Sequence, residues 1–104
     1  MKKYDYHYSV TVRCNDLAIL YCLRALSMYS QQAGRGYTSW GGTGEDAWKS
    51  NNNCVTFRFT RPAYRHLFLE EAMRILPPGS FKEEERKNDD PPEMTEKDIM
   101  KIIQ

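Results

Sequence analysis

The residue types that could carry out chemistry are few in this chain and are not grouped. Its two histidines, His7 and His66, fall in different predicted elements, so no spacing supports a Cys-His or Ser-His-Asp arrangement for nucleophilic catalysis. The three cysteines, Cys14, Cys22 and Cys54, are irregularly spaced within apolar sequence. This is typical of buried, reduced thiols, and not of a disulfide framework or a zinc site. We therefore expect no enzyme activity, no metal and no cofactor.

Arginines in the predicted strands are candidates for binding chemistry. Strand periodicity places His7, Arg13 and Arg58 on the face opposite to that of the aromatic side chains. A guanidinium can bind a phosphate or a carboxylate through two parallel hydrogen bonds, so this face could bind nucleic acid. It lacks the aromatic residues that an RNA-recognition sheet uses to stack bases. The alternative interpretation is an ordinary solvated sheet face.

A glycine-rich segment, residues 34–53, holds five of the six glycines together with both tryptophans. Large aromatic side chains in loops supply contact area at low entropic cost and are common at the energetic centres of interfaces. We therefore predict a partner-binding site at Arg35, Tyr37, Trp40 and Trp48. The alternative is that a tryptophan, Trp48 above all, closes the end of the core.

The elements that must position these residues follow from hydrophobic periodicity. Alternation over residues 4–14 and 55–60 predicts two strands, each with one buried face. Helices are predicted over residues 17–33, ended by Gly34, and from Pro62 to Leu76. Because a structureless loop of some 20 residues is rare in a small domain, we also expect an irregular strand at residues 46–49.

The resulting order, β-α-β-β-α, predicts an α+β fold. It corresponds to a ferredoxin-like half-open sandwich with a three-stranded antiparallel sheet, helices on one face and no closing strand. Residues 1–76 carry 10 Lys/Arg against 6 Asp/Glu, whereas residues 77–104 carry 5 against 8. We therefore predict a domain over 1–76 and a charged, proline-containing tail over 77–104 that is mobile at residues 80–92 and ends in a short helix. Deletion of 81–104 should then leave the melting temperature nearly unchanged.

The outer side of the first predicted helix is unusually apolar. It carries Leu17, Leu20, Tyr21 and Met28 beside Arg24, which is more apolar surface than a solvent-facing side normally shows. We predict that these five residues form an oligomer interface, most simply in a homodimer. The alternative is that the C-terminal segment or the second helix covers part of this side.

Composition and size complete the functional prediction. The chain has 104 residues, a formal charge of +1 and no apolar run long enough to span a bilayer, so we expect a cytoplasmic protein that does not contact membranes. In its size, single α+β domain, lack of catalytic groups and loop aromatics it resembles the small phage and mobile-element inhibitors of host defence, such as anti-CRISPR proteins. That resemblance implies a stoichiometric inhibitor or adaptor that binds a protein partner; nucleic-acid binding by the basic sheet face is the alternative.

Overall fold

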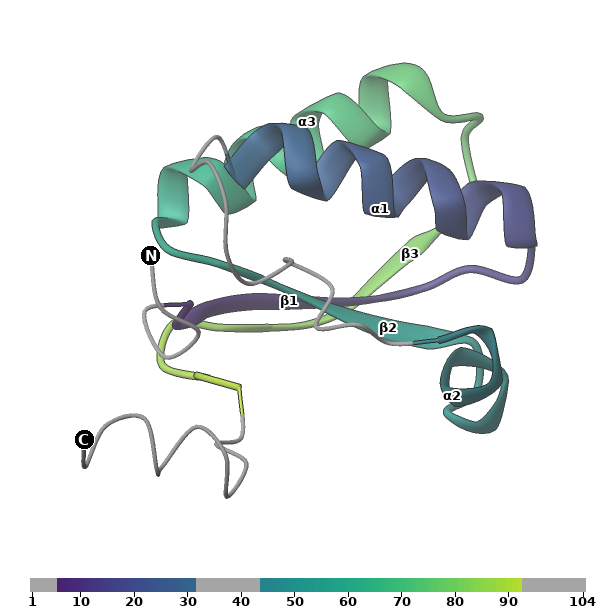
Figure 1. The fold of residues 1–104 in the computed structure, drawn as a ribbon. Coiled ribbons are helices and arrows are strands. Elements are labelled where there is room, and N and C mark those ends of the chain that lie inside the picture. Colours follow the sequence, from purple (N-terminus) through teal and green to yellow (C-terminus); the bar gives the residue numbers. More distant parts are fainter. Residues whose placement is uncertain (1–5, 32–43, 93–104) are drawn as a thin grey trace.

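The central element of the fold is strand β1, which is bonded to a strand on each side. In a computed structural model that describes residues 6–31 and 44–92, the order along the chain is β1 (Tyr8–Arg13), α1 (Leu17–Gln31), α2 (Glu45–Ser50), β2 (Cys54–Phe59), α3 (Pro62–Ile75) and β3 (Lys82–Lys87). The sheet order is β2-β1-β3, and both pairs are antiparallel. Helices α1 and α3 cover one face of the sheet (Figure 1). The predicted α+β fold with a three-stranded antiparallel sheet is therefore confirmed.

The third strand is formed by residues that the sequence assigned to a tail. Residues 82–87 pair antiparallel with β1, so the expectation that no closing strand follows Leu76 is wrong, and the sheet includes residues beyond the predicted domain boundary at 76. All six residues of β3 are exposed. A strand at a sheet edge is held by backbone hydrogen bonds, and its side chains need not be apolar. The predicted helix over 95–104 lies outside the described residues.

A short helix stands where the irregular strand was expected. Residues 45–50 form α2, with acidic residues in the first turn and Lys49 in the last, which suits the helix dipole. Two residues with positive φ, Asn52 at 54° and Asn53 at 61°, turn the chain from α2 into β2; asparagine tolerates this conformation better than most residues do. Apart from this replacement of a strand by a helix, the order is that of the ferredoxin-like arrangement.

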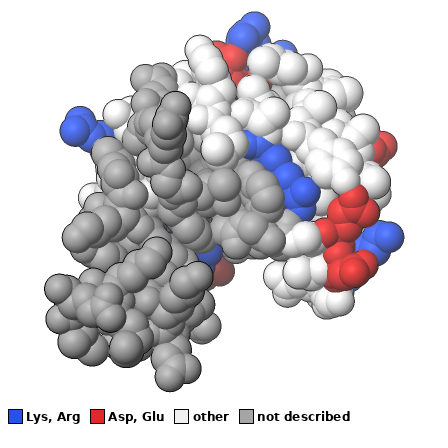
Figure 2. All heavy atoms as spheres, viewed as in Figure 1, with Lys and Arg blue, Asp and Glu red and all other residues white. Residues whose placement is uncertain are grey.

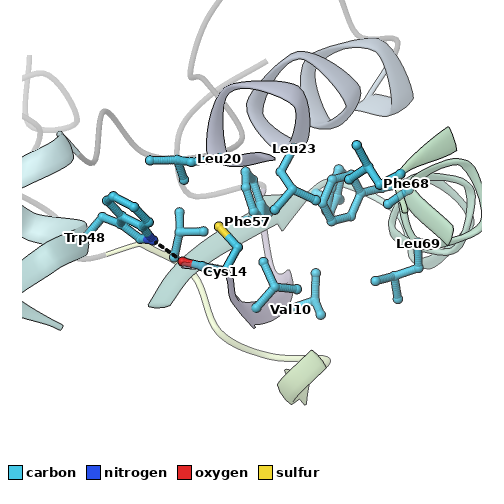
Figure 3. Packing of buried hydrophobic residues seen from close by; sticks show 13 residues of the cluster. Val10, Cys14, Leu20, Leu23, Trp48, Phe57, Phe68 and Leu69 are labelled. Atoms are coloured by element: carbon cyan, nitrogen blue, oxygen red, sulfur yellow. Dashed lines mark hydrogen bonds between the residues drawn. The ribbon is translucent and has the colours of Figure 1, made fainter. Parts of the chain in front are cut away.

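The core lies between the sheet and the two long helices. The inward side chains of β1 and β2 alternate as predicted, and Val10, Val12 and Phe57 are fully buried. The Phe68 ring of α3 lies 4.9 Å from that of Phe57 and 5.4 Å from that of Phe59, measured between ring centroids. Figure 3 shows how Leu20 and Leu23 of α1 close this layer from above. The core thus fixes α1 and α3 on the sheet and determines which of their sides face solvent.

Candidate functional site

The surface most unlike an ordinary solvent-facing surface is the outer side of α1. The helix sequence LAILYCLRALSMYSQ contains a single charged residue, Arg24. Seven residues of the helix are exposed, and all are uncharged: Leu17, Ala18, Tyr21, Cys22, Ala25, Met28 and Tyr29. Tyr29 is 64% exposed. A solvent-facing helix side normally carries charged residues, so this uncharged surface has the character of a contact surface.

Helical periodicity divides the exposed residues of α1, together with the half-buried Arg24, into two groups. Leu17, Tyr21, Arg24 and Met28 lie within an arc of about 60°, at 100° per residue, and we call them the α1 stripe. Next to them Ala18, Cys22, Ala25 and Tyr29 form the outermost side of the helix, here called the outer face. Leu20, predicted with the oligomer interface, is fully buried; it points to the core, about 80° away from Met28 on the helix, and is therefore not an interface residue.

Two side-chain contacts show that the α1 stripe lies on the same side of the molecule as β2. At the C-terminal end of α1, Gln31 donates a hydrogen bond to Thr60 Oγ1 (2.7 Å), and its Oε1 accepts one from the Thr60 backbone N–H (3.1 Å). Near the other end, the Tyr21 hydroxyl donates to the Glu45 carboxylate of α2, which raises the pKa of Tyr21. The stripe lies between these contacts and therefore runs above β2.

Most side chains on this side of the molecule are uncharged. Figure 2 shows a mostly uncharged surface over the helices, with a basic area beside it and acidic side chains toward the end where α2 lies. In the stripe, the Arg24 guanidinium lies 5.4 Å from the centroid of the Tyr21 ring, a cation–π arrangement. The tyrosine and arginine are residue types enriched at interface hot spots.

A second apolar area adjoins the helical layer at the C-terminal end of α3. Met73 is 75% exposed and Ile75 is 53% exposed. Beside them, a shallow groove of about 370 Å³ is lined by Met73, Leu76, Pro77, Pro78, Gly79 and Phe81. Figure 1 shows this end of α3 on the same side of the molecule as the beginning of α1. The exposed apolar surface therefore extends beyond α1.

The predicted basic residues of the open sheet face are each paired with an acid. Arg13 Nε lies 3.6 Å from Glu84 Oε1, and His7 Nδ1 lies 3.3 Å from Asp89 Oδ1. Arg58 lies 3.5 Å from the Asp90 carboxylate and donates to the Asp90 backbone carbonyl at 2.9 Å. All three acids come from β3 or the residues after it. The acidic segment therefore folds back onto the basic strands and balances their charge.

The partner-binding residues predicted in the glycine-rich segment have two different outcomes. Trp48 is 3% exposed, and its indole N–H donates to the carbonyls of Cys14 (3.1 Å) and Asn53 (2.9 Å); Figure 3 shows the bond to Cys14. Trp48 thus closes the end of the core, and its prediction as a partner contact is wrong. Arg35, Tyr37 and Trp40 lie outside the described residues.

A buried arginine that we did not single out from the sequence connects α3 to the sheet. Arg65 is 6% exposed and donates to the backbone carbonyls of Ser9 (3.2 Å) and Lys87 (2.8 Å) and to Asn88 Oδ1 (2.8 Å). Burial, reinforced by the neighbouring Arg86, lowers the pKa of Arg65. The sequence held one signal for this position: with Phe68, Leu69 and Ala72 it follows the spacing of a buried helix stripe.

Comparison of the chain with protein-family models, curated proteins and solved structures gives no match. Within residues 6–31 and 44–92, no three His, Cys, Asp or Glu side chains are grouped so that they could hold a metal ion. Over the same ranges, no helix has the length and apolar character needed to cross a membrane.

Proposed function

We propose that this protein is a small interaction module that binds a protein partner through the outer face of α1, as a stoichiometric inhibitor or adaptor. The observation that carries the proposal is the absence of charge from every exposed residue of α1. Interface centres are depleted in charged residues and enriched in aromatic side chains and methionine, and the outer face presents the exposed Tyr29. Arg35, Tyr37 and Trp40 are proposed to extend the contact.

The rest of the functional proposal follows from the sequence predictions. The anti-CRISPR-type resemblance supports inhibition of a host-defence protein, and a cytoplasmic location would suit that role. Self-association into a homodimer is part of the proposal, because the α1 stripe keeps Leu17, Tyr21 and Met28 exposed. Nucleic-acid binding by the open sheet face has less support, since Arg13, Arg58 and His7 each have an acidic partner that a phosphate would have to displace.

The experiment compares variants of the full chain as bait in the source cell, followed by calorimetry with the purified partner. We expect Tyr29→Lys and Trp40→Ala each to weaken partner binding by about 2 kcal/mol, because a hot-spot aromatic loses its pocket, and to leave the fold intact. Arg58→Ala is the matched control on the open sheet face and should bind like the wild type.

The reverse result would overturn the proposal. If Arg58→Ala abolishes binding while Tyr29→Lys and Trp40→Ala have no effect, the site lies on the open sheet face. Binding of the wild-type chain to random DNA or RNA with a steep salt dependence would then assign it to nucleic acid, because phosphate contacts release counterions.

A further inference from the structure

The two edges of the sheet differ in how they are protected against further pairing. The β3 edge consists only of charged residues. Its pairing with β1 is interrupted by a register shift, because Thr11 lies opposite Glu85 whereas the next residue, Val12, lies opposite Glu83. Charged side chains and bulges are the devices by which proteins block an edge strand. The β3 edge is therefore blocked.

The β2 edge carries neither device. Its sequence, CVTFRF, has one charged residue, and its register with β1 is uninterrupted from Cys54 to Phe59. Among the described residues, no strand pairs with the outer side of β2. A straight, mostly uncharged edge strand is a template for another strand. The α1 stripe lies above this same edge. A strand that pairs with the backbone of β2 would therefore bring its own chain close to the apolar side chains of the stripe.

We propose that the β2 edge pairs antiparallel with the β2 edge of a second copy of this chain, which joins two sheets into one of six strands. The inference rests on the proposed self-association and specifies how it occurs. A two-fold axis that pairs the edges also brings the two α1 stripes to the same seam. The same operation thus brings together both surfaces at one interface, as expected for an isologous contact.

The sequence of β2 permits this pairing without a clash of charge. Residues opposite each other across antiparallel strands lie on the same face of the sheet, so the two-fold axis must pass through one residue position. With the axis at Thr56, Cys54 lies opposite Arg58 of the second copy. With the axis at Phe57, Thr56 lies opposite Arg58. Both registers keep the two arginines apart.

Charge at the ends of the strand favours a second copy as the occupant. Helix α2 lies beyond the Cys54 end of β2 (Figure 1) and carries Glu45 and Asp46 in its first turn. The other end of β2 leads to the exposed Arg61 at the start of α3. Antiparallel pairing sets each end of one strand beside the opposite end of the other. The acids of α2 then lie toward Arg61 of the second copy, and symmetry repeats this complementarity.

The test is sedimentation equilibrium of the full chain at micromolar concentration, with two lysine variants as a matched pair. The wild type should sediment at twice its chain mass of 12.2 kDa. Thr56→Lys sets a lysine opposite a lysine or Arg58 in either register and should raise the dimer dissociation constant about ten-fold or more. Thr11→Lys breaks the same Thr11–Thr56 hydroxyl hydrogen bond of 2.7 Å but lies on the central strand, so the dimer should persist.

The outcomes distinguish self-association of the chain from pairing of the two β2 edges. A wild-type chain that sediments as a monomer overturns both self-association and edge pairing. A dimer that Met28→Lys dissociates and Thr56→Lys leaves intact overturns edge pairing alone. Hydrogen exchange provides an independent measurement: the amides on the outer side of β2 should gain protection as concentration rises through the dimerisation range. Protection of these amides in a monomer would assign the edge to another part of the same chain and refute the inference.

Discussion

Replacement of Arg65 by methionine tests whether the guanidinium holds the third strand to the helical layer. Methionine keeps the apolar stem and removes the three hydrogen bonds to Ser9, Lys87 and Asn88. A hydrogen bond from a charged group contributes about 1.5 kcal/mol or more. The Ser9 carbonyl belongs to a residue that is 2% exposed, whereas Lys87 is exposed and its carbonyl regains water more easily. We therefore expect Arg65→Met to lower the free energy of unfolding by about 3 kcal/mol.

The assay is urea denaturation followed by far-UV circular dichroism, with the midpoint and the slope fitted separately. In a thermal scan, the same loss corresponds to a melting temperature lower by about 10–20 °C for a domain of this size. The control is Arg74→Met on the same helix, because Arg74 is exposed and its guanidinium pairs with Glu71 one turn away. Its transition should stay close to that of the wild type. If Arg65→Met behaves like Arg74→Met, the Arg65 bonds do not hold β3, and the reasoning fails.

Three further predictions follow from the core and the sheet. Trp48→Phe should lower the free energy of unfolding by about 1.5 kcal/mol, because the Cys14 and Asn53 carbonyls lose their indole donor; an unchanged denaturation midpoint would refute this role. Burial raises the pKa of the Cys14 thiol, so at pH 8 a thiol reagent should modify the exposed Cys22 rapidly and Cys14 only on unfolding, as mapped by mass spectrometry. Because folding favours the neutral Cys14 thiol, its contribution to stability should be lost as pH rises past the ordinary thiol pKa of about 8.5. Deletion of residues 81–104 should abolish the cooperative melting transition, contrary to the expectation from the sequence, since it removes β3 and two of the three Arg65 acceptors, those of Lys87 and Asn88.

The sequence by itself determined the elements whose side chains pack on the core. The alternation through Val10, Val12, Val55 and Phe57 identifies β1 and β2, because a strand with one buried face must repeat every two residues. The apolar periodicity of α1 and α3 likewise indicates helices on one face of a sheet. The sequence also predicts the uncharged outer side of α1, since the fifteen residues of this helix include a single charged residue, Arg24.

Only the tertiary structure decided the elements that are held by something other than an apolar pattern. The strand β3 is charged throughout and is fixed by backbone pairing with β1 and by Arg65, neither of which leaves a periodic signal. The six-residue helix α2 is too short to be stable alone, and the burial of Trp48 holds it in place. The sequence showed that residues 77–104 are acidic and the strands basic, but which acid meets Arg13, Arg58 or His7 depends on where the chain returns to the sheet.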